Sequence, residues 1–341
     1  MKILPSRDIP MLVEARERKK GFIPILEVLI FFAVLIVAST VQSLPTTIVS
    51  TGRLLSDSTF MAKVMELLQA GDIAGYVSLI TESILSDQPA WMHIVTLFST
   101  VLCTVIVILF CRVIQKRRPS SMGLNRKGAV PEYLKGALIG AVMISATVLL
   151  CVVFGGVKLS LSKFNIWLVL LFFVGYMFQG MSEEVLCRGY LMVSITRRNQ
   201  VWRAVLVSSL VFSLLHIMNP GYGVLPFVNI LLCGAVFGVY ALKRNDLWGA
   251  CAMHSLWNFF QGNIFGISVS GTGRGEGDSI LSSAVREGAS DLVTGGKFGI
   301  EGSICCTVVM VAALALVLFV MKPAKGLVSF PAPEEAVPAE E

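Results

Sequence analysis

The chain has 341 residues, of which 55% are hydrophobic and only 15% are charged, and its mean hydropathy is +0.76. These values exclude a soluble globular protein and indicate an all-α, polytopic helical membrane protein. None of the eight cysteines falls in a segment predicted to lie outside the cell, and no CxxC pair occurs, which excludes a disulfide framework.

Apolar runs of spanning length recur along the whole chain and predict about eight transmembrane helices. They are about 22–41, 92–111, 136–154, 165–184, 204–217, 225–242, 247–264 and 303–321. The first run follows a basic head, is too long for a secretory signal and is interpreted as a signal anchor. In the third run Gly136 and Gly140 form a pair of small residues suited to close helix contact.

The predicted organisation has four parts. They are an N-terminal membrane region (1–164), a core of four spans (165–264), an outer loop with the last span (265–321) and a disordered cytoplasmic tail (322–341). The N-terminal region includes an outer loop, 43–91, and a basic cytoplasmic connector, 112–135. Two amphipathic stretches in the outer loop, about 59–69 and 74–85, are expected to lie on the membrane surface.

The distribution of positive charge predicts the topology. With the N-terminus placed inside, most of the 28 lysine and arginine residues flank the spans on the cytoplasmic side. This asymmetry predicts that both termini are cytoplasmic. The net charge of +6 is thereby explained without a nucleic-acid partner, and we expect a multi-pass protein of the plasma membrane in contact with the lipid bilayer.

Two adjacent carboxylates and an arginine stand at the end of the otherwise apolar fourth run: Glu183, Glu184 and Arg188. Charges at membrane depth persist where they pair, line a wet cavity or carry chemistry. In a helix, Glu184 and Arg188 are four residues apart and share a face, whereas Glu183 is rotated away by about 100°. The pattern predicts one carboxylate held by a guanidinium and a neighbour that faces something else.

Two of the three histidines also lie in apolar spans. Phe212 and His216 share one helix face, as do His254 and Asn258. A single intramembrane histidine is usually a hydrogen-bonding residue that tightens helix packing, and His93 is given no role. The histidines, the asparagine and the three charged residues of the fourth run are harder to explain in that way, because buried polar groups need partners.

This set of side chains is chemically sufficient for hydrolysis. A carboxylate can take a proton from water, an imidazole can orient that water, and histidine and asparagine can donate to an oxyanion. The two adjacent glutamates are expected to titrate as a coupled pair.

Three motifs in this order, Glu183-Glu184-xxx-Arg188, Phe212-xxx-His216 and His254-xxx-Asn258, resemble the CPBP family of intramembrane endopeptidases. That family includes the type II CAAX prenyl proteases and the bacterial self-immunity proteins. The resemblance covers about residues 165–261. It implies that Glu183 is the general base, that His216 holds the water with it, and that His254 and Asn258 are oxyanion donors. Glu184, Arg188 and Phe212 then support the site.

The resemblance implies an endopeptidase that cleaves a membrane-associated protein or peptide through a glutamate-activated water. Three other interpretations stay open: zinc held by Glu183, His216 and His254, a non-catalytic immunity or scaffold protein, and a transporter with a proton-relay carboxylate. No metal is favoured, although zinc is possible. The sequence indicates neither the identity of the substrate nor the oligomeric state.

One geometrical difficulty follows from straight spans. Glu183 is expected near the cytoplasmic end of the fourth span, whereas His216 lies roughly 18 Å from that side at 1.5 Å per residue. Tilt, a break near Gly189 or a later start of the fifth span has to bring the two residues together.

Overall fold

Helices occupy every segment in which the sequence predicts a membrane span. The computed structural model describes residues 8–18, 21–85, 89–272 and 278–324. The helices of these segments are α2 (Pro24–Ser56), α5 (Ala90–Val113), α6 (Ala129–Val153), α7 with η2 and α8 (Ile166–Thr196), α9 (Val201–Leu214), α10 (Val224–Arg244), α11 (Trp248–Phe259) with η3 (Phe260–Ile264), and α13 (Ile304–Ala315) with η6 (Leu316–Val320).

Within the described part of the chain, five of these helices are long and apolar enough to cross a membrane. They are α2, α5, α6, the continuous helix Ile166–Thr196 and α10, while α9 and Ile304–Val320 are shorter apolar helices. The predicted all-α, polytopic membrane fold is confirmed. The number of eight spans and the cytoplasmic location of both termini stay predictions.

Helix α6 shows how the sequence separates a lipid-facing side from a packed side. Val130, Leu134 and Leu138 follow one another at intervals of four residues and are all exposed. Gly136 and Gly140, on the opposite side, are buried. This arrangement suits a helix in a membrane: large apolar side chains face the lipid, and glycine allows a neighbouring helix to approach closely.

The glycines bring α6 and α7 unusually close to α11. A Cβ atom added at Gly140 would lie 2.3 Å from the carbonyl oxygen of Met253. One added at Gly180 of α7 would lie 2.4 Å from Oγ of Ser255. The predicted close contact at Gly136 and Gly140 is therefore confirmed, and it fixes α11 between two neighbouring helices on either side of His254.

The fourth predicted span coincides with α7, which ends as an α-helix at Glu184, but the helical structure does not stop at the two glutamates. The helix continues as η2 (Val185–Met192), a π-helix, and α8 (Val193–Thr196). Glu184 and Arg188 pair with each other inside this continuous helix, so neither charged group has to reach water. The wide π turns leave carbonyl groups for other partners: Cys187 accepts from Ser208 Oγ at 2.8 Å and Gly189 from Arg117 Nη2 at 2.9 Å.

This continuation removes the expected separation between Glu183 and His216. Glu183 lies 13 residues before Thr196, which is roughly 20 Å along the helix, and His216 lies a comparable distance after Val201. The depths of the two residues therefore agree without a break at Gly189, whose turn is held by Arg117.

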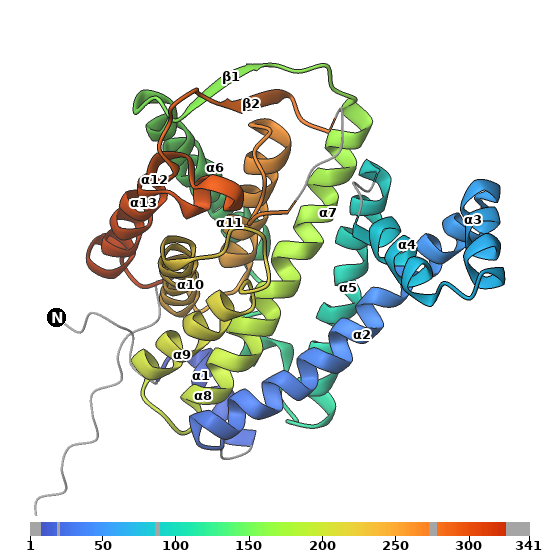
Figure 1. Cartoon of the computed structure of the whole chain (residues 1–341). Helices are drawn as coiled ribbons and strands as arrows, with labels where there is room; N and C mark the ends of the chain where they lie inside the picture. Colours follow the sequence, from blue (N-terminus) through green and yellow to red (C-terminus); the bar gives the residue numbers. More distant parts are fainter. Residues whose placement is uncertain (1–7, 19–20, 86–88, 273–277, 325–341) are drawn as a thin grey trace, which may run out of the picture.

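The region expected to be a polar loop, 265–302, contains regular structure that the sequence did not predict. Strand β2 (Leu281–Val285) pairs antiparallel with β1 (Val157–Leu161), and Ser160 faces Ser282 in the register. Figure 1 shows this two-stranded sheet across one end of the helices. Short helical segments follow at α12 (Asp291–Thr294), η4 (Gly296–Phe298) and η5 (Ile300–Gly302).

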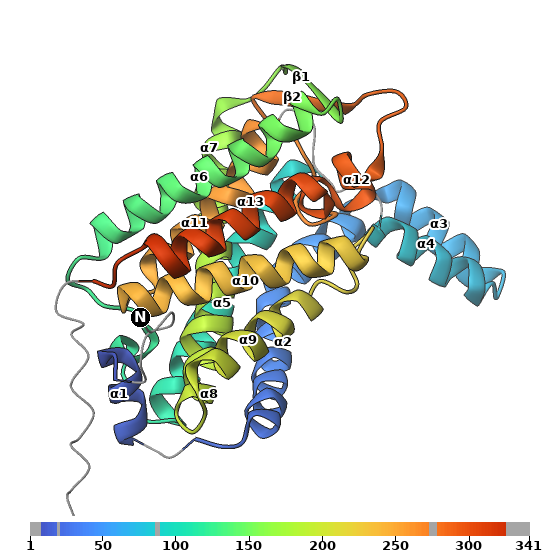
Figure 2. The ribbon, with the colours of Figure 1, turned by 90° about the vertical axis from the view of Figure 1, so that its left-hand side faces the viewer.

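Two further helices, α3 (Ser58–Gln69) and α4 (Ile73–Leu85), project sideways from the bundle beside the C-terminal part of α2 (Figures 1 and 2). Asp57 caps α3 by accepting from Thr59 N. The two amphipathic stretches of the sequence are thus helical, and their position on the membrane surface stays a prediction.

The two ends of the chain differ from the expected organisation in detail. The basic head contains a short helix, α1 (Pro10–Arg18), and the connector 112–135 contains η1 (Pro119–Met122) and the beginning of α6. Met11 N donates to Asn245 Oδ1 at 2.8 Å, so α1 docks against the turn after α10. The predicted disordered tail lies outside the described residues from 325 onward.

Candidate active site

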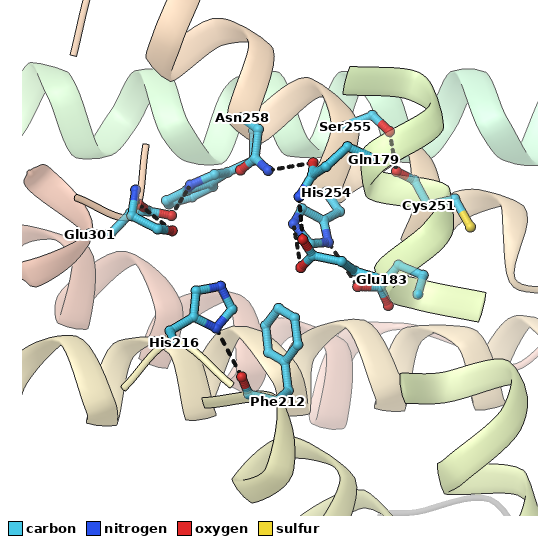
Figure 3. Close-up of polar contacts among 12 residues, drawn as sticks. Gln179, Glu183, Phe212, His216, Cys251, His254, Ser255, Asn258 and Glu301 are labelled. Carbon is cyan, nitrogen blue, oxygen red and sulfur yellow. Dashed lines mark hydrogen bonds and ion pairs between the residues drawn. The ribbon is translucent and has the colours of Figure 1, made fainter. Parts of the chain in front are cut away.

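Five of the seven predicted site residues line one cavity of about 260 Å³ inside the bundle. Glu183 reaches it from α7, His216 from the turn after α9, and His254 and Asn258 from α11, with Phe212 between the two histidines (Figure 3). His93 of α5, which sequence reasoning left without a role, lines the same cavity.

Behind the cavity lies the buried ion pair of Glu184 and Arg188. Arg188 Nη1 is 2.8 Å from Glu184 Oε1, and both side chains are fully buried. The predicted stacking of these residues on one helix face is confirmed. The guanidinium also lies 4.2 Å from the centroid of the Phe212 ring, a cation–π contact that packs Phe212 against the site.

His254 connects the buried pair to the cavity. Its Nδ1 lies 2.9 Å from Glu184 Oε1, and its Nε2 lies 3.8 Å from Glu183 Oε2. A carboxylate paired with an arginine accepts hydrogen bonds, so His254 Nδ1 carries the proton and donates it. Glu184 therefore fixes the orientation of the imidazole and directs its Nε2 toward Glu183.

The two glutamates have different surroundings, as the helical spacing predicts. Glu184 is fully buried, whereas the Glu183 side chain is 32% exposed and lines the cavity. Glu183 accepts a hydrogen bond from Gln179 Nε2, and Gln179 Oε1 accepts from Asn258 Nδ2 at 2.9 Å. One carboxylate is thus occupied by structural partners, and the other is presented to the cavity.

Sequence reasoning missed Gln179, although a signal for it exists. It stands four residues before Glu183 in an apolar run, at the spacing that places two side chains on one helix face. In the structure it links the residue expected to act as base with an expected oxyanion donor, so its contacts place it within the site.

His216 occupies the wall opposite His254 (Figure 3). Its Nδ1 lies 2.9 Å from the carbonyl oxygen of Phe212, and the two rings meet edge to face at 5.1 Å. His216 and Glu183 share the cavity, but no direct hydrogen bond joins these two described residues. A ligand between them is needed to connect the two side chains.

Glu301 is the second residue that the sequence did not reveal. It comes from η5 in the outer loop and lines the cavity beside Trp257, whose Nε1 donates to Glu301 Oε1 at 3.2 Å. No local sequence pattern predicts a role for Glu301, because its loop reaches the site only through the tertiary fold. Trp257 thereby connects α11 to this loop.

Two alternative chemistries are a cysteine nucleophile and a zinc site. Cys187, next to the ion pair, is fully buried, as a thiol that packs in the core is. For zinc, the residues considered are Glu183, His216 and His254. Among the described residues, no group of three or more His, Cys, Asp or Glu side chains is arranged to hold a metal ion. Bringing the three together around zinc would require these side chains to move.

The comparison with protein families agrees with the geometry of the site. Residues 165–260 match the family model described as type II CAAX prenyl endopeptidase Rce1-like, and this segment contains all seven predicted site residues. A search of curated proteins and a search of solved structures each returned no match. Residues 165–260 are therefore similar to the CAAX-type intramembrane endopeptidases, and this similarity supports the resemblance to the CPBP family.

Proposed function

We propose that the chain is an intramembrane endopeptidase that hydrolyses a peptide bond of a membrane-associated protein or peptide by a Glu183-activated water. One observation carries the proposal: the side chains of Glu183, His216, His254 and Asn258 converge on one cavity from three separate parts of the chain. We further propose that the enzyme resides in the plasma membrane, in agreement with its several apolar helices.

Glu183 is suited to the role of general base. It is the carboxylate of the adjacent pair that faces the cavity, and Gln179 holds its Oε1 while Oε2 lies on the side of His254. A water molecule between Glu183 and His216 would lose its proton to Glu183 as its oxygen attacks the carbonyl carbon of the substrate. The same proton then passes to the leaving amine nitrogen when the C–N bond breaks.

His254 and Asn258 are suited to stabilise the oxyanion. The Asn258 amide has two N–H donors, of which one binds Gln179 and the other is available to a ligand. A doubly protonated His254 would donate from Nε2 into the cavity. Together with Glu183, Glu184 and Arg188 such a histidine gives the group zero net charge, which suits a buried site.

The main alternative functions predict different experimental behaviour. A scaffold or immunity protein would need the polar set only to hold helices together, so the protein would not turn over any substrate. A zinc enzyme would use the same side chains as ligands, and its activity would depend on the metal. A transporter usually shows a repeat between halves, whereas here the intramembrane polar set is confined to the second half of the chain.

The test is a cleavage assay on the purified full chain in lipid nanodiscs, combined with peptidomics of membranes from a strain that lacks the gene. We expect at least one membrane-associated segment to accumulate uncut in that strain and to be cleaved by the purified protein. Glu183→Gln should be inactive, and Glu66→Gln, at an exposed ion pair with Lys63, should be active. Equal activity of preparations containing Glu183→Gln and the unaltered protein would overturn the proposal.

A further inference from the structure

Part of the cavity wall is formed by residues outside the proposed catalytic set. Helix η3 brings Asn263 to it, and η5 brings Glu301. We refer to these two residues, with Trp257 and Ser270, as the acceptor end of the cavity. Figure 3 shows Glu301 on the far side of Asn258 from Glu183, so Glu301 lies beside the catalytic residues and is not one of them.

The Glu301 carboxylate is held by neutral donors only. Trp257 Nε1 donates to Oε1, and Gln261 Nε2 and Ser270 Oγ each donate to Oε2 at 3.0 Å. Ser270 N also donates to Oε2. The residue is 8% exposed, and no lysine or arginine occurs among the described residues that line the cavity. Its negative charge is therefore fixed in place without a cation from the cavity wall.

Asn263 supplies an independent observation in the wall of the same cavity. It is 2% exposed and lines the cavity, and its Oδ1 accepts no hydrogen bond. Its Nδ2 donates to the carbonyl oxygen of Asp278, which determines which side of the amide is the oxygen. Gln261 Oε1, on the same short helix, is also buried and accepts no hydrogen bond. A buried acceptor without a donor is unfavourable and is satisfied by a ligand that brings N–H groups.

We propose that the acceptor end is a subsite for a cationic side chain, lysine or arginine, of the peptide substrate. This assignment rests on the proposed function, since it takes the ligand of the cavity to be a peptide. An ammonium or guanidinium group supplies what this end lacks: positive charge near Glu301 and N–H donors for Asn263.

The subsite distinguishes a peptide segment with a basic side chain from a segment with a free C-terminal carboxylate. A free C-terminal carboxylate placed near Glu301 would be repelled, because like charges close together in a partly desolvated site are unfavourable. The cavity therefore favours a segment with an internal lysine or arginine over a segment that ends in a free carboxylate beside this wall.

The first test measures binding and needs no cleavage. The full chain in nanodiscs is titrated with n-butylguanidinium and, separately, with butylurea, its neutral counterpart of the same shape. We expect the guanidinium to bind at least about tenfold more tightly, and we expect Glu301→Gln to abolish this preference. Asn263→Leu, which keeps the approximate shape and removes the acceptor, should weaken guanidinium binding as well.

Glu66→Gln serves as the control, because it removes one carboxylate from an exposed pair with Lys63 on α3, which projects sideways from the bundle. It should bind both compounds as the unaltered protein does. Equal affinity for the two compounds would overturn the subsite. A preference for the guanidinium that persists in folded Glu301→Gln and Asn263→Leu would also overturn it. The same holds if calcium or magnesium ions bind at this position and displace the guanidinium.

The second test separates this inference from the proposed function. Amidated octapeptide libraries, each with lysine fixed at one position, are compared with libraries that carry norleucine there. We expect one position at which lysine raises the cleavage rate about tenfold, and a free C-terminal acid placed next to it to reduce the rate. Cleavage without any such preference contradicts the subsite alone. Guanidinium-selective binding without cleavage of any library supports the subsite and contradicts the proposed function.

Discussion

Glu184 and His254 are separated by 70 residues and are joined by a hydrogen bond of 2.9 Å between Oε1 and Nδ1. The bond crosses from α7 to α11 and adds to the ion pair that the same oxygen makes with Arg188. It divides the two adjacent glutamates by function: Glu184 holds the imidazole, and Glu183 keeps an oxygen directed into the cavity. This division leads to different expectations for the two carboxylates.

Glu183→Gln should abolish hydrolysis without loss of fold. An amide oxygen cannot take the proton of the attacking water, whereas the side chain keeps its shape and its place in a partly exposed cavity. The measurement is turnover of the purified variant, with its unfolding temperature as the control. Full activity of the variant would move the role of base to another residue.

Glu184→Gln should instead reduce the folded yield, because it leaves Arg188 buried without a carboxylate partner. Removing one member of such a pair costs on the order of 3–5 kcal/mol of unfolding free energy. Arg188→Ala should have a similar effect. Yield after size-exclusion chromatography and the unfolding temperature check this expectation, and an inactive but fully stable Glu184→Gln would contradict it.

Gln179→Met should lower turnover while leaving stability almost unchanged. The thioether keeps the length of the side chain but cannot donate to Glu183 or accept from Asn258, so both lose an orienting partner. We expect a loss of about tenfold or more in kcat, since loosening one positioned polar group is typically worth one or more orders of magnitude. Unchanged kcat with a raised KM would assign Gln179 to substrate binding.

The sequence predicted the parts of the site that depend on local spacing. The pairing of Glu184 with Arg188 follows from their separation of four residues, and the close approach of α6 to α11 follows from Gly136 and Gly140. Both are properties of a single helix surface, so one stretch of sequence is sufficient to predict them.

The features that the sequence missed depend on how the helices continue and on distant loops. The continuation of the helix beyond Glu184 was not predicted: α7 ends at Glu184 as an α-helix, and a π-helical stretch that contains Arg188 extends it. Glu301 was missed because it reaches Trp257 from a loop of no recognisable periodicity. Strand β1 was missed because its partner, β2, lies more than 100 residues later.

Gly140→Ala should destabilise the protein and reduce activity. The added Cβ atom would lie 2.3 Å from the carbonyl oxygen of Met253, so α11 must shift and carry His254 with it. We expect a loss of about 1–3 kcal/mol in the free energy of unfolding. The matched control is Gly52→Ala in α2, where nothing lies within 4 Å, and there alanine should be neutral or stabilising by up to about 1 kcal/mol. Equal stability of the two variants would contradict the packing argument.

Asp246→Asn should change how stability depends on pH. Asp246 lies in the turn before α11, and its burial raises the pKa of its carboxyl group to about 6, even though Trp248 N donates to it. Between about pH 4 and pH 6 the unfolded chain ionises first, so the folded state binds more protons. The contribution of Asp246 to the free energy of unfolding therefore falls as pH rises through this window.

Asparagine caps a helix about as well as aspartate and carries no charge. The variant should lack the pH-dependent contribution of Asp246. Between pH 4 and pH 6.5 its unfolding temperature should therefore rise relative to that of the unaltered protein. Thermal unfolding in a neutral detergent measures it. Parallel curves across the whole window would show that Asp246 titrates as an ordinary exposed carboxyl.

The metal dependence follows from the charges around the cavity. Glu183, Glu184 and Arg188 sum to one negative charge when His254 is neutral, which leaves little surplus for a divalent ion. A cation beside Arg188 would be repelled unless both glutamates stayed ionised, and one oxygen of Glu184 is already bonded to Arg188 and His254. We therefore expect hydrolysis to proceed without zinc.

To test this expectation, protein purified without added metal is assayed alongside elemental analysis, and is assayed again after prolonged chelation. Activity should persist with less than stoichiometric zinc. Stoichiometric zinc, with activity lost on chelation and restored by zinc alone, would instead make Glu183, His216 and His254 its ligands.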